Sequence, residues 1–183
     1  MLAAYARGMF PMDLADGRLA WWSPDPRGVL VPGDVHVSRS LRRSMSAFEF
    51  TVDEDFGAVI RACRDARPNE VWITADFVDA YERLHEMGWA HSIEVRSAGR
   101  LVGGLYGVEV GGLFAAESKF HRVSDASKAA VVHLASALAA AGDDRLVDVQ
   151  WRTGHLASLG VTAIARREYL DRLPGLTAVP PCW

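Results

Sequence analysis

Cysteine is nearly absent from this sequence. Among 183 residues there are two, Cys63 and Cys182, and two cysteines form neither a disulfide framework nor the paired spacing of a zinc site. The six histidines are scattered along the chain. His85 and His91 do not have the one-turn spacing that places two metal ligands on one helix face. The sequence therefore implies no disulfide scaffold and no bound metal.

Long apolar runs and a strong net charge are missing as well. No stretch approaches the roughly 18 residues of a membrane-spanning helix. The first residues also lack the basic segment followed by an apolar one that marks a secretory signal. The formal net charge is −3, so binding to a polyanion would have to come from local patches of positive charge. We expect a cytoplasmic protein that does not bind membranes.

What remains is an ordinary globular composition, with 50% hydrophobic and 23% charged residues. This chain length suits one domain with a small appendage. Periodicity and turn residues predict strands at 28–32, 48–54 and 146–151, further strands over 90–120 that turn at 98–99 and 111–112, and helices at 55–66, 74–88 and 125–141. Shorter helices are expected at 1–9, after Ser38, near 155–158 and at 167–172, with a proline-rich loop over 21–27.

This order of elements predicts an α+β domain that resembles the fold of the GCN5-related N-acetyltransferases. In the helix at 74–88, four residues recur at helical spacing and are expected to face the core, namely Phe77, Tyr81, Leu84 and Met87. The helix at 125–141 is apolar on most sides, so we expect it to be buried.

Short motifs follow one another in a fixed order over nearly the whole chain. They include Ala4-Tyr5-x-Arg7-Gly8-Met9-Phe10-Pro11, Trp21-Trp22-Ser23-Pro24-Asp25-Pro26-Arg27, Ser38-Arg39-Ser40, Trp72-Ile73-Thr74, Gly103-Gly104-Leu105-Tyr106-Gly107, Glu117-Ser118-x-Phe120, Asp148-x-Gln150 and His155-x-x-Ser158-Leu159-Gly160. Together they resemble the leucyl/phenylalanyl-tRNA–protein transferases. These bacterial enzymes move Leu or Phe from aminoacyl-tRNA onto the N-terminal Arg or Lys of a protein.

The resemblance implies a GCN5-related N-acetyltransferase-like (acyl-CoA N-acyltransferase-like) catalytic domain over 27–183. Residues 1–26 would be the remnant of a small N-terminal domain, because family members carry a further Gly-Gly-Asp-Leu motif that is absent here. The resemblance also implies no metal and no coenzyme A. In agreement, the helix at 125–141 is not preceded by the Gly-rich loop that holds a pyrophosphate on a helix N-terminus.

Asp148 and Gln150 are two residues apart on a predicted strand, so their side chains share one face. In the family the matching pair is held to be catalytic: the Gln orients and helps deprotonate the attacking amine, and the Asp polarises the Gln. The reaction is aminolysis of an activated ester, which mainly needs alignment and one proton transfer. An amide is a very weak base, so we favour a hydrogen-bonding role for Gln150, with the proton leaving through the tRNA ribose. Without the resemblance, the pair is simply a polar strand face.

Other positions match residues that contact the substrates. Glu117 matches an acid at the acceptor site, where a carboxylate can bind an ammonium group; its alternative role is cross-strand partner of Tyr106. Tyr5 and Trp72 match aromatic residues that contact the terminal adenosine and the aminoacyl group, and Trp72 alternatively belongs to the core. Met12 stands where the family usually has a Trp.

The family's pocket for the Leu or Phe side chain maps to seven positions, most of which would otherwise be ordinary core residues. Lys119 replaces the usual Met there, so we expect weaker selection for Leu and Phe. With a two-residue turn at 111–112, Leu105 would lie opposite Ser118, and a bulge would be needed for all of these residues to line one site. The seven positions are Leu105, Phe114, Lys119, Val131, Leu134, Leu138 and Val147.

Four basic residues are candidates for phosphate contacts. Arg39, Arg42 and Arg43 form one stripe on a predicted helix, and Lys128 begins another helix. The stripe is expected to contact the tRNA acceptor stem independently of sequence. The alternatives are a solvated helix face and a helix cap.

We therefore predict a cytoplasmic, monomeric aminoacyltransferase without a cofactor. It would transfer Leu, Phe and possibly Met from the 3′ end of aminoacyl-tRNA to acceptor proteins with N-terminal Arg or Lys, marking them for N-degron degradation. The alternatives are another acyltransferase of the same fold, either CoA-dependent or building peptidoglycan from aminoacyl-tRNA, and a non-catalytic relative that only binds aminoacyl-tRNA.

Overall fold

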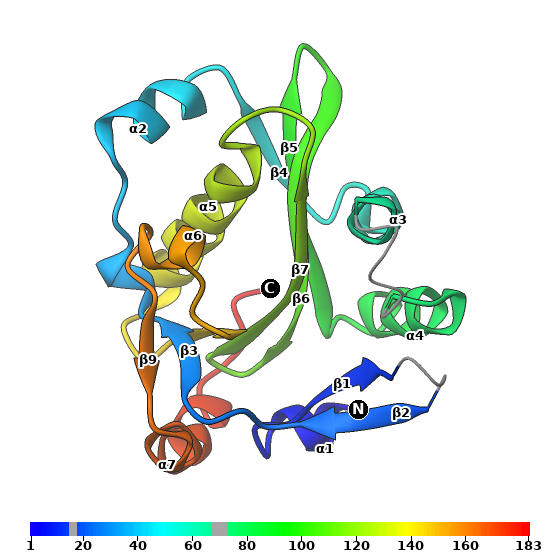
Figure 1. Ribbon diagram of the computed structural model, residues 1–183, viewed down its shortest axis with the longest axis vertical. Helices are drawn as coiled ribbons and strands as arrows, with labels where there is room; N and C mark the ends of the chain where they lie inside the picture. The colour runs from blue at the N-terminus through cyan, green and yellow to red at the C-terminus, as the bar shows by residue number, and fades with distance from the viewer. Residues whose placement is uncertain (15–17, 67–72) are drawn as a thin grey trace.

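The computed structural model describes the chain except for residues 15–17 and 67–72. The described residues form a seven-stranded sheet with the order β4-β5-β6-β7-β8-β3-β9 and a two-stranded sheet of β1 and β2 (Figure 1). In the large sheet β7 and β8 run parallel and the other described pairs run antiparallel. The strands are β1 (Phe10–Asp13), β2 (Leu19–Trp22), β3 (Arg27–Leu30), β4 (Glu49–Val52), β5 (Ala90–Ser97), β6 (Arg100–Val110), β7 (Leu113–His121), β8 (Leu146–Gln150) and β9 (Thr162–Ile164).

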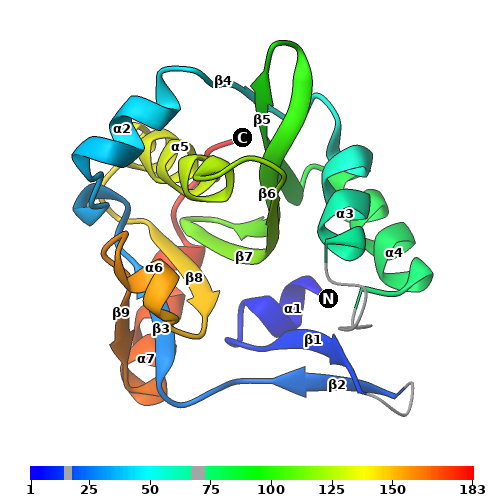
Figure 2. The ribbon, with the colours of Figure 1, turned by 45° about the horizontal axis from the view of Figure 1, so that its top comes forward.

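Helices cover both faces of the large sheet (Figures 1 and 2). On one face α5 packs with α2 over one apolar cluster, and on the other α3 and α4 pack over a second cluster. The helices are α1 (Leu2–Tyr5), α2 (Arg39–Met45), α3 (Phe56–Asp65), α4 (Ala75–Glu86), α5 (Ala126–Ala141), α6 (Gly154–Ala157) and α7 (Arg166–Thr177), with a 3₁₀ turn at Pro32–Asp34. The α+β class predicted from the sequence is confirmed.

Side-chain caps explain where several helices begin. The Ser38 hydroxyl accepts a hydrogen bond from the backbone N–H of Leu41 at 3.2 Å, which starts α2 as the sequence predicts. The hydroxyl of Thr74 accepts from Phe77 in the same way and starts α4. Each cap satisfies a backbone N–H that has no partner inside its helix, which is worth about 1 kcal/mol.

Three expectations about local structure were wrong. Met87 is 59% exposed because α4 ends at Glu86, so the helical periodicity no longer applies to it. Trp21 and Trp22 lie in β2 instead of a loop, because the prolines at 24 and 26 follow this strand without interrupting it. The first helix covers only Leu2–Tyr5, and the chain then turns at Gly8, which has a φ of 75°.

The β6–β7 hairpin turns at 111–112 as predicted, but its register shifts by one residue between Tyr106 and Gly107. Leu105 consequently pairs with Lys119 and Tyr106 with Ser118, leaving Glu117 as the extra residue of a β-bulge. Gly107 permits this bulge, because a Cβ there would collide with the Phe114 ring and the Ala115 carbonyl oxygen. The bulge that the sequence analysis required is therefore present.

Candidate active site

A cavity of about 370 Å³ lies where β7 and β8 stop pairing. Their parallel pairing ends at Ala115 and Asp148, and the residues that follow on both strands line the cavity. The remaining walls come from β1, β6, α5 and the segment after β8. The lining residues are Phe10, Pro11, Met12, Leu105, Ala116, Glu117, Ser118, Lys119, Val131, Val149, Gln150, Trp151, Thr153 and Leu156.

Asp148 is 1% exposed and has a fully hydrogen-bonded carboxylate. Its Oδ1 accepts from Nε of Arg27 at 2.8 Å and from the backbone N–H of Gln150 at 2.9 Å. Its Oδ2 accepts from Nη2 of Arg27 at 2.5 Å and from the hydroxyl of Tyr169 at 2.8 Å. Two carboxylate oxygens offer about four acceptor positions, so these donors fill them.

Arg27 is 1% exposed, and its forked contact neutralises the charge of Asp148. Burial lowers the pKa of Arg27, but the hydrogen bond and the charge of Asp148 outweigh burial and raise the pKa overall. The guanidinium also lies over the Tyr169 ring, 4.5 Å from its centroid. This pair is therefore a buried ion pair whose two charges depend on each other.

Gln150 ends β8 in the left-handed region, with a φ of 60°. That conformation costs a residue other than glycine about 1–3 kcal/mol, and the hydrogen bond from its N–H to Asp148 helps to hold it. Gly28 lies opposite on β3, where a Cβ would approach the backbone N of Arg152 to 2.7 Å. The side chain of Gln150 lines the cavity, and its buried Nε2 has no hydrogen-bond partner among the described residues.

Glu117, the bulge residue, lines the same cavity. Its Oε2 accepts a hydrogen bond from the Tyr81 hydroxyl at 2.9 Å, whereas its buried Oε1 has no hydrogen-bond partner in the described part of the chain. The pKa of Glu117 is raised to about 7, chiefly by burial; the charge of Asp148 also raises it, while the hydrogen bond from Tyr81 and the charge of Arg27 lower it. Glu117 can therefore hold or release a proton near neutral pH.

Tyr5 lies in the apolar cluster under α3 and α4, beside Tyr81. It is 2% exposed and does not line the cavity. Its hydroxyl is 2.6 Å from that of Tyr81, which places Tyr5 at the end of a hydrogen-bonded chain leading to Glu117. Burial raises the pKa of both tyrosines well above the usual value, so both hydroxyls keep their protons.

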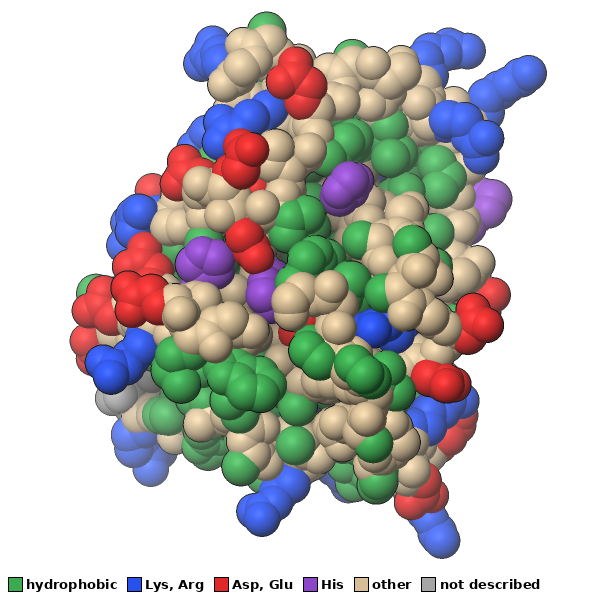
Figure 3. Space-filling model, turned by 180° about the vertical axis from the view of Figure 1, so that it is seen from behind, with side chains coloured by type: hydrophobic (Ala, Val, Ile, Leu, Met, Phe, Trp, Pro, Cys, Tyr) green, Lys and Arg blue, Asp and Glu red, His purple; other side chains and the backbone are tan. Residues whose placement is uncertain are grey.

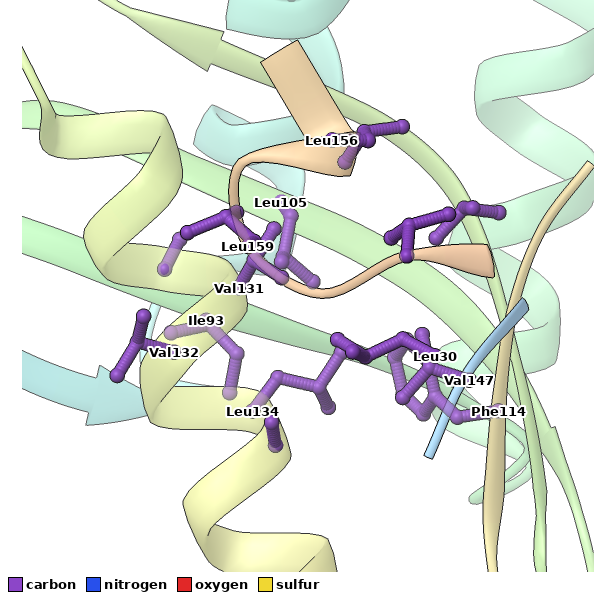
Figure 4. Close-up of a cluster of buried hydrophobic side chains, with 14 of the residues drawn as sticks. Leu30, Ile93, Leu105, Phe114, Val131, Val132, Leu134, Val147, Leu156 and Leu159 are labelled. Atoms are coloured by element: carbon purple, nitrogen blue, oxygen red, sulfur yellow. The ribbon is translucent and has the colours of Figure 1, made fainter. Parts of the chain in front are cut away.

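The seven residues of the predicted amino-acid pocket fall into two groups, one that lines the cavity and one that lies in the core. Leu105, Lys119 and Val131 line the cavity. The other four lie in the apolar cluster on the α5 face, each at most 1% exposed, and Figure 4 shows Phe114 and Val147 beside Leu30, with Leu134 on the α5 helix. These four are Phe114, Leu134, Leu138 and Val147. They do not reach the cavity because the inner face of α5 and the paired parts of β7 and β8 bury them.

Of the adenosine candidates, Met12 lines the cavity, and Trp72 lies outside the described residues.

Near the hairpin of β1 and β2, a hollow lined by Leu19, Trp21 and Phe77 adjoins the start of α4. Figure 3 shows hydrophobic side chains gathered in the lower part of the face opposite that of Figure 1.

Arg39, Arg42 and Arg43 are exposed on α2. Lys128 lines a hollow of about 470 Å³ next to Ser38 at the start of this helix. Burial lowers the pKa of His155, and the charges of Lys119 and Lys128 lower it further, so these two lysines lie near one histidine. These arginines and Lys128 thus lie close together, on α2 and the first turn of α5.

Sequence reasoning missed Arg27, Tyr81 and Tyr169 as parts of the site. Arg27 closes a matched motif, but its partner Asp148 is 121 residues away. Tyr81 carries the correct signal for a core residue of α4, which hides its hydroxyl contact with Glu117. Tyr169 had no signal beyond its place in a terminal helix.

Within the described ranges, no group of three His, Cys, Asp or Glu side chains could hold a metal ion. In the same part of the chain, no helix is long and apolar enough to cross a membrane.

Comparison with known proteins matches almost the whole chain. Residues 29–174 match the family model described as leucyl/phenylalanyl-tRNA protein transferase, and residues 1–25 match the model of its N-terminal domain. The chain is 49% identical over 179 residues to the leucyl/phenylalanyl-tRNA–protein transferase of Solidesulfovibrio magneticus, covering 94% of this chain and 72% of that protein. It is 45% identical over 192 residues to that of Shigella dysenteriae, covering 100% and 82%.

Among solved structures, a conserved protein of unknown function from Bacteroides thetaiotaomicron has a TM-score of 0.53 at 9% identity, over 81% of this chain and 55% of that one. The two therefore share a fold. A GCN5-related N-acetyltransferase from Kribbella flavida has a TM-score of 0.47 at 12% identity, over 86% of this chain and 57% of that one. With both family models matched and relatives 45% and 49% identical, the chain belongs to the leucyl/phenylalanyl-tRNA–protein transferase family.

Proposed function

We propose that this protein transfers Leu or Phe, and also Met, from aminoacyl-tRNA to the N-terminal Arg or Lys of acceptor proteins, which marks them for N-degron degradation. One observation carries the proposal most directly. Two buried polar atoms, Nε2 of Gln150 and Oε1 of Glu117, lack hydrogen-bond partners among the described residues, and both side chains line one cavity. Buried polar atoms without partners are costly, so a substrate that supplies both partners fits this cavity.

In the proposed reaction the acceptor amine attacks the carbonyl carbon of the aminoacyl ester. A C–N bond forms, the C–O bond to the ribose breaks, and one proton passes from the nitrogen to the departing oxygen. Glu117 binds the ammonium and takes its proton, since a pKa of about 7 is close to the pKa of about 8 for an α-amino group. Gln150 donates from Nε2 to the carbonyl oxygen, where negative charge develops.

The donor side chain would occupy the apolar part of the cavity. Leu105, Val131 and Leu156 line this part, and a volume of about 370 Å³ suits a Leu or Phe side chain. Phe114, Leu134, Leu138 and Val147 would then support this wall from the core. Lys119 at the same wall lowers the preference for apolar donors, because an ammonium is costly to bury.

The tRNA would bind through its phosphates. Arg39, Arg42 and Arg43 are exposed along α2, and Lys128 lies close to the start of that helix. Contacts of this kind are insensitive to nucleotide sequence and weaken with salt. Met12 and Trp72 are the proposed contacts for the terminal adenosine, and Tyr5 supports Glu117 through Tyr81.

We place the boundary between the N-terminal unit and the catalytic domain after residue 26, giving units of 1–26 and 27–183. The proposed reaction uses charged tRNA, so its compartment is the cytoplasm. One copy of the chain contributes every group that this mechanism needs, which fits a monomer.

The test is transfer of labelled Leu or Phe from charged tRNA to a peptide beginning with Arg, beside a peptide beginning with Ala and the Asp148→Ala variant. We expect product with the first peptide and wild-type protein, and little in both controls. If wild-type protein binds charged tRNA but gives no product, the chain is a non-catalytic tRNA-binding relative.

A further inference from the structure

Arg27 and Tyr169 hold the carboxylate of Asp148, yet neither residue lines the cavity. We propose that they are positioning residues. Both orient the side-chain amide of Gln150, and Arg27 also aligns the β1 and β8 walls of the cavity. The expected effects on transfer kinetics rest on the proposed function, whereas the expected effect on the conformation of Gln150 rests on the geometry alone.

The carboxylate of Asp148 has no free acceptor position among its four contacts. Arg27, Tyr169 and the backbone N–H of Gln150 together occupy its acceptor positions. Asp148 therefore has no position left for an incoming ammonium or for the side-chain amide of Gln150. Its influence on Gln150 passes through the backbone N–H, where it stabilises the left-handed conformation from which the amide reaches the cavity.

Arg27 also contacts the β1 wall of the cavity. Nη1 of Arg27 donates to the Gly8 carbonyl at 3.0 Å, and the guanidinium lies 5.0 Å from the Phe10 ring centroid. Phe10 begins β1, which contributes Phe10, Pro11 and Met12 to the cavity. One guanidinium thus joins the β1 wall to the β8 wall. A lysine cannot replace it, because one ammonium cannot make the forked contact and reach the Gly8 carbonyl as well.

Two conservative variants separate the two links. Tyr169→Phe removes only a hydrogen bond to Asp148, so we expect kcat to fall about threefold to tenfold, with an unchanged KM for charged tRNA. Arg27→Lys removes both links, so we expect kcat to fall about 10- to 100-fold together with a raised KM for charged tRNA. Arg145→Lys is the matched control, because Arg145 is also buried and also contacts a carboxylate, that of Glu109, and a distant carbonyl, that of Pro180.

A double-mutant cycle with Gln150→Ala distinguishes positioning from general stability. If Tyr169 acts through Gln150, Tyr169→Phe changes kcat by less than about twofold in the Gln150→Ala background, whereas Arg27→Lys retains the part of its loss that comes from the β1 wall. Equal losses of kcat from Tyr169→Phe in both backgrounds would overturn the proposal. If Arg27→Lys does not fold, Tyr169→Phe decides the question by itself.

The conformation of Gln150 can also be measured without an assay of transfer activity. In ¹⁵N–¹H spectra the backbone amide signal of Gln150 should shift in Tyr169→Phe and Arg27→Lys, and should stay in place in Arg145→Lys. An unmoved Gln150 signal in both test variants would disprove the positioning role even if the wild-type protein proved unable to transfer an amino acid. Loss of wild-type transfer with shifted signals would instead disprove the proposed function alone.

Discussion

The hydroxyl of Tyr81 donates a hydrogen bond to Oε2 of Glu117 over 2.9 Å, while the other oxygen of this carboxylate is buried without a partner among the described residues. One oxygen of Glu117 is thus fixed to α4, and the other is left without a partner at the wall of the cavity. Glu117 is also the extra residue of the β7 bulge, which explains how it lines the same cavity as Leu105. This arrangement suits a proton acceptor for a bound ammonium.

The first prediction concerns the pH dependence of transfer. Burial raises the pKa of Glu117 to about 7, so the ionised form that accepts a proton develops as the pH rises through 7. We expect kcat/KM for the acceptor peptide to rise through this range in the wild-type protein. Glu117→Gln should lower kcat/KM about 100-fold at pH 8 and remove the rise, leaving only the ionisation of the peptide amine. A wild-type profile retained in the variant would show that Glu117 is not the base.

The same group affects stability in a defined pH window. Between its ordinary value of 4.5 and about 7, the native state retains a proton that the unfolded chain has lost. Rising pH therefore lowers the free energy of unfolding in this window, by up to about 3 kcal/mol. Urea unfolding of wild-type protein and Glu117→Gln at pH 5 and pH 8 should show the variant gaining stability relative to wild type at pH 8. An equal difference at both values would contradict the raised pKa.

Lys119 is the third test. It lines the proposed donor pocket and pairs across the hairpin with Leu105. Lys119→Met replaces an ammonium with an apolar side chain of similar length, so we expect kcat/KM for the Phe and Leu donors to rise about tenfold. Competition between Phe-tRNA and a donor with a polar, uncharged side chain, such as Ser-tRNA, measures the change in the preference for apolar donors. An unchanged preference would place Lys119 outside donor selection.

The arginines of α2 are expected to act only on tRNA affinity. Replacing Arg39, Arg42 and Arg43 by Ala together should weaken tRNA binding and reduce the slope of log Kd against log salt by about 2 to 3. The control is Arg167→Ala, which removes a 93% exposed charge from α7, at the other end of the molecule from α2 (Figure 1). Single-turnover transfer at saturating tRNA should remain within about twofold of wild type. Equal effects of the α2 and α7 variants would argue against a specific tRNA contact.

The elements that the sequence predicts well are those with a local physical signal. Ser38 caps α2, the apolar periodicity of α4 ends at Leu84, and the Gly pair at 111–112 turns the β6–β7 hairpin. The hairpin of β1 and β2 escaped prediction because Pro11 and the prolines after Trp22 resemble loop residues. Pro11 is tolerated there because β1 is an edge strand of a two-stranded sheet.

In the candidate site, too, the residues with a local sequence signal were predicted and those without one were not. Asp148, Gln150 and Glu117 were identified through their motifs, and the structure places all three at or beside one cavity. The roles of Arg27 and Tyr169 depend on contacts between segments far apart in the chain, which no local pattern encodes. Tyr5 was also identified through its motif, but its burial and its contact with the Tyr81 hydroxyl are tertiary features that the motif does not encode.

We propose that transfer takes place in the cavity where β7 and β8 stop pairing, and that Gln150 stabilises the reacting carbonyl. Single-turnover transfer of labelled Phe from pre-bound charged tRNA to a peptide beginning with Arg tests it most directly. We expect rapid transfer by wild-type protein and a rate about 100-fold lower in Gln150→Ala, with binding of charged tRNA unchanged. An equal rate in the variant would show that Gln150 does not stabilise the reacting carbonyl.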